Sequence, residues 1–332
     1  MGPAELWAII SKHVRRISQK TLDDPRFKGG HQHSIWAVVR LFLLCQFEGF
    51  SAGVLYERLG RDRTFRRRYG LANRLISYSQ YKKRLKTSAF TLALFELLSF
   101  SAQSTLRQLG KQETEVVITD LTSIQGNRWK DVYGAWGADS SGFFYGYKLG
   151  LITSSHGVIL GMALMKANWT EHTIQSRLLR MSRDVIQAAH GEVQVSYLLA
   201  DSGFDGERTY KNARRMLNAT ALIPPRRKRD PKSKHARSSF CRAKNKTPYR
   251  FQAQQLWENP ASKEIAKRRS EIERVNAQLK SAPFRVQEVP KRSKGVQRLT
   301  RVILGKLLVY NFALNVNALR STPLRVIRGL VA

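Results

Sequence analysis

The sequence is poor in acidic residues and in cysteine. Only 24 of its 332 residues are Asp or Glu, against 58 Lys and Arg, so the formal net charge is +34. The two cysteines, Cys45 and Cys241, lie far apart and outside any metal-ligand spacing, so neither a disulfide framework nor a zinc site is indicated. Reduced cysteines favour a cytoplasmic setting. The N-terminus shows neither the basic segment nor the cleavage site of a secretory signal.

No apolar run is long and uncharged enough to predict a membrane span. The longest run, Val302 to Leu319, contains a lysine and three asparagines, so we predict a buried or amphipathic helix there and no membrane partner. With 42% hydrophobic residues the chain can bury a sizeable core, and its length suffices for about two domains. The strong positive charge predicts a polyanionic partner, most often nucleic acid.

Residues 1–112 are predicted to be a helical, basic domain. Apolar helices over Trp36–Phe47 and Phe90–Ser101 flank a stretch from Arg61 to Lys86 with ten Lys or Arg and one acid. Small helical units with a basic face and interleaved aromatic residues suit duplex DNA, although a charge run is usually a solvated face. The residues expected to contact DNA here are Arg66, Arg67, Arg68, Lys82, Lys83 and Arg84.

From Glu113 the pattern changes to strands. A meander comes first and is followed by strands that alternate with helices, which predicts a mixed sheet. The expected elements are a strand at Val116–Ile124, a hairpin of Tyr145–Ile152 with Val158–Leu164, a helix at Thr173–Ala189, a strand at Tyr197–Ala200, a helix at Glu207–Leu217 and a strand at Thr220–Ile223.

A basic insertion follows at about residues 226–261. Its first part, Arg226 to Arg250, has eleven Lys or Arg and one acid, and it is predicted to be an exposed or disordered segment that contacts phosphate. A single long helix is then expected from Ser262 to about Ser281. The DNA-binding residues expected in the insertion are Arg226, Arg227, Lys228 and Arg229.

Three acids stand out as candidates for chemistry. Asp120 interrupts a β-branched run where Asp is uncommon, and a buried carboxylate needs a partner, a proton or a metal. Asp201 follows a short apolar strand and precedes a glycine turn, where α/β sheets carry their ligands, although a turn or cap residue explains it equally well. Glu273 falls near Arg269 and Lys280 on the surface of the expected helix. Taken by itself, this spacing indicates an ordinary i,i+4 ion pair between Arg269 and Glu273.

Together the three acids predict metal-assisted phosphodiester chemistry. Three carboxylates can hold two divalent cations that activate a hydroxyl and stabilise the leaving oxygen, and Mg²⁺ suits an all-oxygen site. Three further residues stay open as alternatives. Asp205 is a less favoured replacement for Asp201 as a metal ligand. His172 either faces DNA or is a helix cap. Lys148 either faces the active cleft or has the orientation that ordinary strand alternation gives it.

From about residue 113 to 320 the sequence resembles bacterial insertion-sequence transposases of the DDE type, in the group named after insertion sequences four and five. The most specific match is that group's pattern of Tyr, two residues, Arg, three residues, Glu, six residues, Lys. Arg269, Glu273 and Lys280 have this spacing, whereas Ala266 replaces the Tyr, which bears on the positioning of the reacting DNA and not on the acids. The segments Thr119–Ser123, Ala200–Phe204, Gly146–Leu149 and Ala167–His172 also look like the family's.

The resemblance implies an α/β fold with an RNase H-like mixed sheet flanked by helices in residues 113–332, and a helical end-binding domain before it. It implies that Asp120, Asp201 and Glu273 bind two Mg²⁺, with Mn²⁺ as a substitute, and that Arg269 and Lys280 hold DNA phosphates. The implied partners are the element's terminal repeats, target DNA and, in the DNA complex, a second copy of the chain. The implied place is the bacterial cytoplasm, at the nucleoid. The alternatives are an inactive DNA-binding descendant and an RNase H-like nuclease without strand transfer.

Overall fold

The chain forms two compact units. One consists of residues 1–108 together with 278–332, and the other of residues 109–277. The computed structural model describes residues 3–16, 35–71, 75–126, 131–139, 142–225, 247–287, 295–324 and 326–327. The boundary predicted at residue 112, between a DNA-binding domain and a catalytic domain, stays a prediction.

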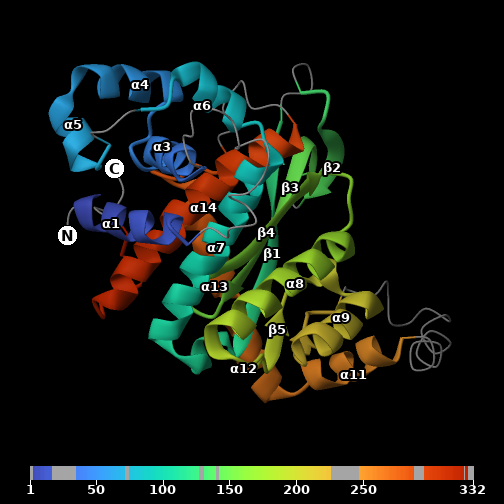
Figure 1. Ribbon diagram of the computed structural model, residues 1–332. Coiled ribbons are helices and arrows are strands. Elements are labelled where there is room, and N and C mark those ends of the chain that lie inside the picture. The colour runs from blue at the N-terminus through green and yellow to red at the C-terminus, as the bar shows by residue number, and fades with distance from the viewer. Residues whose placement is uncertain are drawn as a thin grey trace. The chain divides into compact units, whose positions relative to one another are not determined.

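A six-stranded mixed sheet forms the centre of the 109–277 unit (Figure 1). β1 pairs antiparallel with β3 and parallel with β5, and β5 pairs parallel with β6, which confirms the predicted mixed sheet. The order is β2-β3-β1-β5-β6, and β4 also pairs with β3. The strands are β1 (Val116–Gln125), β2 (Ala135–Asp139), β3 (Gly142–Ser154), β4 (Ile159–Lys166), β5 (Tyr197–Leu199) and β6 (Thr220–Leu222).

Helix α8 (Glu171–His190) covers one face of this sheet. A Cβ placed on Gly150 of β3 would lie 2.5 Å from Ile174 of α8, so the glycine lets the helix lie directly against the strand. Leu121 of β1, opposite Gly150 in the register, is on the same face. Because neighbouring residues of a strand point to opposite faces, Asp120 points away from α8. The fold is the RNase H-like arrangement of a mixed sheet flanked by helices.

The rest of this unit is helical, with one departure from the expected pattern. The structure contains α9 (Glu207–Leu217), α11 (Pro248–Trp257), α12 (Pro260–Lys267) and α13 (Ser270–Lys280). The single helix expected over 262–281 is therefore wrong. The chain turns at Arg268 and Arg269, where backbone amides bond to carbonyls three residues back instead of four. Pro248, expected in an irregular segment, begins α11 at a position that tolerates a missing N–H.

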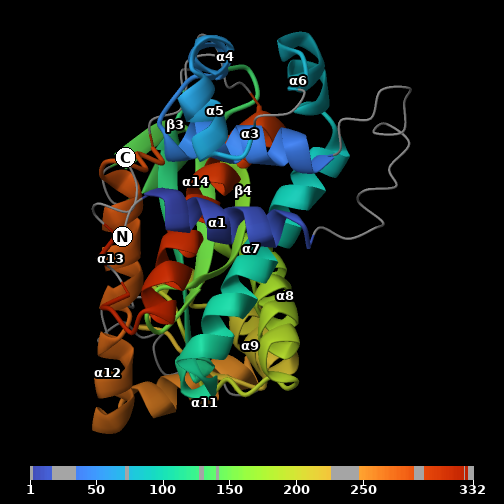
Figure 2. The ribbon, with the colours of Figure 1, turned by 60° about the vertical axis from the view of Figure 1, so that its left-hand side comes forward.

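The 1–108/278–332 unit is built from helices, as predicted for the N-terminal region. Helix α14 packs against α1 and α3 (Figure 2). By length and composition both α7 and α14 could cross a membrane, but 78% of the apolar window of α14 is buried inside the protein, as expected for Val302–Leu319. The helices are α1 (Pro3–Val14), α3 (Ile35–Phe47), α4 (Ala52–Arg61), α5 (Arg63–Arg68), α6 (Tyr78–Arg84), α7 (Ser88–Leu109) and α14 (Val296–Leu319).

Buried polar side chains tie α14 to α7 inside this unit. Asn311 Nδ2 donates to Ser101 Oγ at 3.4 Å, and Asn315 Nδ2 donates to Thr105 Oγ1 at 3.1 Å. These asparagines interrupt the apolar run that the sequence presents. Each amide has a partner on α7, which offsets the cost of burying it.

Candidate active site

Asp120 is a half-buried acid in the middle of β1. Its Oδ2 accepts a hydrogen bond from Asn276 Nδ2 of α13 at 2.7 Å. Burial raises the pKa of this carboxyl to about 6, and the negative charges of Asp201 and Glu273 act in the same direction. A hydrogen bond from the Leu121 backbone and the charge of Arg269 act against the rise. The fold therefore brings the three acids and Arg269 into one electrostatic neighbourhood.

This raised pKa makes a prediction about stability. The folded pKa lies above the ordinary value of 3.8, so the folded chain loses stability as pH rises from below 4 through 6. The loss at neutral pH is about 3 kcal/mol. In EDTA, Asp120→Asn is expected to raise the free energy of unfolding by up to that amount at pH 7.5 and by little at pH 4, as measured by urea denaturation. An equal gain at both pH values would contradict the account. The exposed-acid variant Asp184→Asn is the control.

Asp201 follows β5 and begins the turn of Ser202–Phe204. Its Oδ1 accepts the Gly203 amide at 2.9 Å, so the acid caps the turn and also interacts with Asp120. The turn cap that the sequence left open as an alternative is therefore present, and a catalytic role for Asp201 stays a prediction. A Cβ on Gly203 would lie 2.9 Å from the same Oδ1, so only glycine leaves the carboxylate undisturbed.

For the DNA nicking that the family resemblance implies, Gly203→Ala is expected to displace the Asp201 carboxylate and to lower the rate by roughly 10²-fold, because a misplacement of about 1 Å is that costly. The measurement is the nicking rate at saturating protein, with DNA binding followed in parallel. Gly60→Ala is the matched control, because a Cβ there meets open space. Native nicking by Gly203→Ala would argue that Asp201 has no part in the reaction.

Glu273 lies in the first turn of α13 with an exposed side chain. Its Oε1 is 2.8 Å from Arg269 Nη2, so the pair that the sequence suggested is present, although Arg269 lies in the turn just before the helix. Lys280 is exposed at the last residue of α13. The assignment of the three acids to catalysis and of these two cations to DNA contact stays a prediction.

The acids fit a hard divalent cation by donor type, because all three offer carboxylate oxygens. Within the described residues, however, no group of three or more His, Cys, Asp or Glu side chains lies close enough to hold a metal ion. Each carboxylate instead has a partner in the protein, namely Asn276, the Gly203 amide or Arg269. The three carboxylates are therefore neighbours that do not converge on a single point.

Asp205 has a structural role and is not an open ligand. Its fully buried carboxylate accepts two bonds from Arg250, Nε to Oδ1 at 2.8 Å and Nη2 to Oδ2 at 2.6 Å. Tyr210 donates a third bond to Oδ1 at 3.0 Å. This network joins α11 to the beginning of α9, whereas Asp201 contributes to the raised pKa of Asp120.

The other two open residues also have partners in the fold. The ring Nδ1 of His172 lies 2.9 Å from Thr209 Oγ1, and Gly206 leaves room for the imidazole, since a Cβ there would lie 2.5 Å from its Cε1. Lys148 Nζ pairs with Glu171 at 3.0 Å. Lys148 lies opposite Ser123 in the register, an odd number of residues from Asp120, so it lies on the opposite face of the sheet.

Sequence reasoning missed two residues beside the acids. Asn276 is buried and donates a hydrogen bond to Asp120. The sequence feature that could have indicated it is an amide side chain on the apolar helix face formed by Ile272, Val275 and Leu279. Glu171 is the second, since a Cβ on Gly203 would lie 3.5 Å from its Cγ. The signal was its place within Ala167–His172, a segment that looks like the family's, although an acid in the first turn of a helix is otherwise ordinary.

The expected DNA-binding cations of the N-terminal region lie on two short helices. Asp62 caps α5 by accepting the Phe65 amide at 2.8 Å, and Tyr81 anchors α6 in the core. Of the six predicted cations, Arg67, Arg68, Lys82 and Lys83 are exposed, and Arg66 and Arg84 are half-buried. Arg226, Arg227, Lys228 and Arg229 lie outside the residues that the structure describes.

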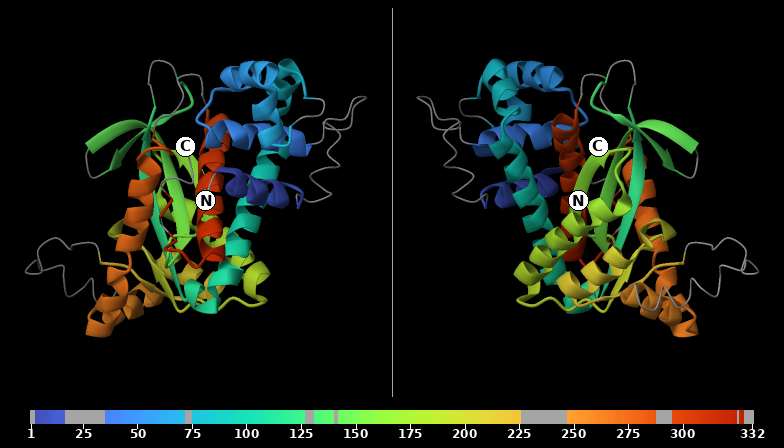
Figure 3. Two further views of the ribbon diagram at one scale, coloured as in Figure 1. Left: turned by 90° about the vertical axis from the view of Figure 1, so that its left-hand side faces the viewer. Right: turned by 90° about the vertical axis from the view of Figure 1, so that its right-hand side faces the viewer.

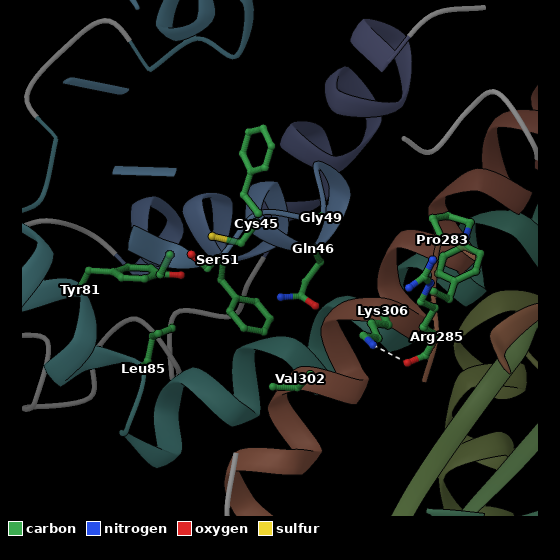
Figure 4. A pocket seen from close by; sticks show the side chains of 14 residues that line it. Cys45, Gln46, Gly49, Ser51, Tyr81, Leu85, Pro283, Arg285, Val302 and Lys306 are labelled. Carbon is green, nitrogen blue, oxygen red and sulfur yellow. Dashed lines mark hydrogen bonds between the residues drawn. The ribbon is translucent and has the colours of Figure 1, made fainter. Parts of the chain in front are cut away.

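A cleft of about 440 Å³ in the 1–108/278–332 unit has no acid in its lining (Figure 4). Cys45 and Tyr81 lie on one side, and Arg285 and Lys306 on the other, where Lys306 Nζ donates to the Arg285 carbonyl at 2.7 Å. Burial raises the pKa of the Cys45 thiol to about 12, so it is not a nucleophile at neutral pH. This cleft therefore has no group for phosphodiester chemistry.

One comparison with protein families gives a match over most of the 109–277 unit and part of the chain that follows it. A family model described as a transposase DDE domain matches residues 111–312, more than half of the chain. No curated protein and no solved structure matches. The matched span includes every strand and the three acids. Members of the family act on DNA and generally use divalent metal ions. The chain therefore belongs to the family of DDE transposases.

Proposed function

We propose that this chain is the transposase of an insertion sequence, of the group named after insertion sequences four and five. In this proposal it nicks DNA at the element's ends and joins the freed 3′-hydroxyl to target DNA. Asp120, Asp201 and Glu273 are its catalytic residues. The observation that carries the proposal is that Asp201 and Glu273 lie near enough to Asp120 to help raise its pKa, within the part of the chain that the family match covers.

The metal-binding part of the proposal assigns Mg²⁺, with Mn²⁺ as substitute, to the carboxylates of Asp120, Asp201 and Glu273. Two such ions would lower the pKa of the attacking hydroxyl and stabilise the leaving oxygen of the phosphodiester. Asp120 is held in place by Asn276 on a rigid strand, and Asp201 by the Gly203 amide. Glu273 would leave Arg269 to join them, and its exposed side chain permits that movement.

Release of Glu273 gives Arg269 a second role. The freed guanidinium can bind a DNA phosphate with two parallel hydrogen bonds, next to the acids that act on the backbone. Lys280 is proposed to hold a further phosphate as a point charge. In this proposal the Arg269–Glu273 ion pair keeps the charges of both side chains neutralised until metal and DNA bind.

Binding of the element's ends is assigned to residues 1–112, and catalysis to residues 113–332. The cations of α5 and α6 fit this role because four of the six are exposed on short, capped helices. The cations Arg226 to Arg229 are proposed to contact phosphate from the basic insertion. We place the protein in the bacterial cytoplasm, at the nucleoid, and as a homodimer in its DNA complex.

An inactive DNA-binding descendant is the second candidate, because Ala266 stands where the group has a Tyr beside the reacting DNA. A nuclease without strand transfer is the third. The test is incubation of the native chain with DNA that carries the element's flanking ends, in Mg²⁺, Mn²⁺ or EDTA. Metal-dependent nicks at the element boundary followed by joined products would support the transposase. Binding without nicks would favour the descendant, and nicks at any sequence without joining would favour the nuclease.

A further inference from the structure

The hairpin of β2 and β3 carries large apolar side chains on its outer face. Trp136 lies opposite Tyr145 in the register and Ala138 opposite Phe143, so these four side chains share one face. The exposed fraction is 54% for Trp136 and 87% for Phe143. Val132 and Tyr133, which lead into β2, are exposed as well. We call Val132, Tyr133, Trp136, Ala138 and Phe143 the hairpin patch.

The opposite face of the same hairpin is packed. Phe144 is buried, and a Cβ on Gly137 would lie 2.5 Å from the Ala167 carbonyl oxygen at the end of β4. An antiparallel hairpin with one packed face normally has polar residues on the other. Here the solvent-facing positions next to the turn are aromatic or small and apolar, which indicates a surface that another molecule covers.

The hairpin patch is held in a defined position. Tyr147 Oη donates to Asp131 Oδ2 at 2.7 Å, and Tyr145 Oη donates to the Asp131 carbonyl at 2.7 Å. Trp136 and Tyr145 form an edge-to-face pair with ring centroids 5.7 Å apart. The hairpin projects from the end of the sheet (Figure 3). A projecting, preorganised surface loses little conformational entropy when it binds.

The charge of this segment identifies the kind of partner. Residues 131–147 contain no Lys or Arg and two Asp, in a chain whose net charge is +34. A DNA surface needs cations for its phosphates, and this segment supplies none. Two copies of so basic a chain repel each other over most of their surface, and a segment without cations is where they can approach.

We propose that the hairpin patch is a self-association surface, on which a second copy of the chain docks with the same face. Trp136 and Phe143 of the two copies would pack together, as aromatic residues do at the centre of symmetric interfaces. The proposal names the surface through which the proposed homodimer would form, and it does not depend on the chemistry of the acids. A test of self-association can therefore give a negative result while a test of DNA cleavage gives a positive one, and the reverse.

Analytical ultracentrifugation of the full chain tests the proposal, at about 0.5 M salt to screen charge repulsion. The native chain is expected to show a concentration-dependent dimer, and the double variant Trp136→Ser/Phe143→Ser a dissociation constant at least ~10-fold higher. Leu92→Ser is the matched control, since it removes an apolar side chain that is 56% exposed on α7. That control is expected to dimerise like the native chain.

A native chain that stays monomeric at every concentration, alone and with DNA, would overturn the proposal. A double variant that dimerises like the native chain would also overturn it. Weaker DNA binding with unchanged dimerisation would assign the hairpin patch to DNA. Circular dichroism checks folding, and if the double variant fails to fold, the single variant Phe143→Ser replaces it, because that side chain is almost fully exposed.

Discussion

Replacing Asp201 by asparagine is expected to lower nicking at the element's ends by roughly 10²- to 10³-fold or more, the range found when one group that stabilises transition-state charge is removed. The variant should fold, because asparagine caps a turn as well as aspartate and can accept the same Gly203 amide. It should also bind the element's ends like the native chain. The measurement is the single-turnover nicking rate in Mg²⁺ at equal occupancy of the DNA, which a gel-shift titration sets.

A matched control separates this effect from the loss of one negative charge. Asp184→Asn removes an exposed acid of α8, so it should leave the nicking rate unchanged. The double variant Asp120→Asn/Asp201→Asn should be hardly slower than either single variant, since groups that act as a unit are not additive. Nicking that persists in Asp201→Asn would place the reaction on other acids. Loss of DNA binding would point to misfolding instead.

Arg250→Met is expected to destabilise the 109–277 unit by about 3–5 kcal/mol, the cost of leaving a buried charge without its partner. The Asp205 side chain is fully buried, and the substitution removes both bonds from the guanidinium while the bond from Tyr210 stays. The backbone amide of Arg250 also donates to Glu207 at 2.8 Å, and methionine keeps this bond. The substitution therefore tests the side chain alone. Urea denaturation, followed by circular dichroism, measures the free energy of unfolding.

The control for this prediction is Arg183→Met. Arg183 pairs with Asp184 on the surface of α8, and such exposed pairs are worth about 0–1 kcal/mol. A change below about 1 kcal/mol for Arg250→Met would show that Asp205 is protonated or reached by water. In that case Asp205 would no longer count as a structural acid.

Several features of the fold follow from local patterns. The β-branched run of β1, the turn at Ser154–Gly157 and the amphipathic helix Glu207–Leu217 were all predictable, because each depends on residues within one element. β2 was not predicted. Its residues, Ala-Trp-Gly-Ala-Asp, are mostly ones that are rare in strands, and pairing with β3 decides their conformation.

The turn at Arg268 and Arg269, between α12 and α13, could not be predicted from the sequence for a related reason. Neither proline nor glycine marks it, and the apolar positions of α12 and α13 keep a helical spacing across it. Periodicity describes which side chains share a face, and it does not report a change in the hydrogen bonds of the backbone.

By itself the sequence determined the excess of positive charge, the mixed sheet and the three acidic segments, because composition and local periodicity carry that information. Only the tertiary structure decided that acids separated by 81 and 72 residues in the sequence become neighbours. It placed Asn276 on Asp120 and Arg250 on Asp205, two partners that no local pattern showed. These contacts depend on burial and on partners from distant segments. Burial and such partners determine the cost of a charged carboxylate and its pKa far more than its neighbours in sequence do.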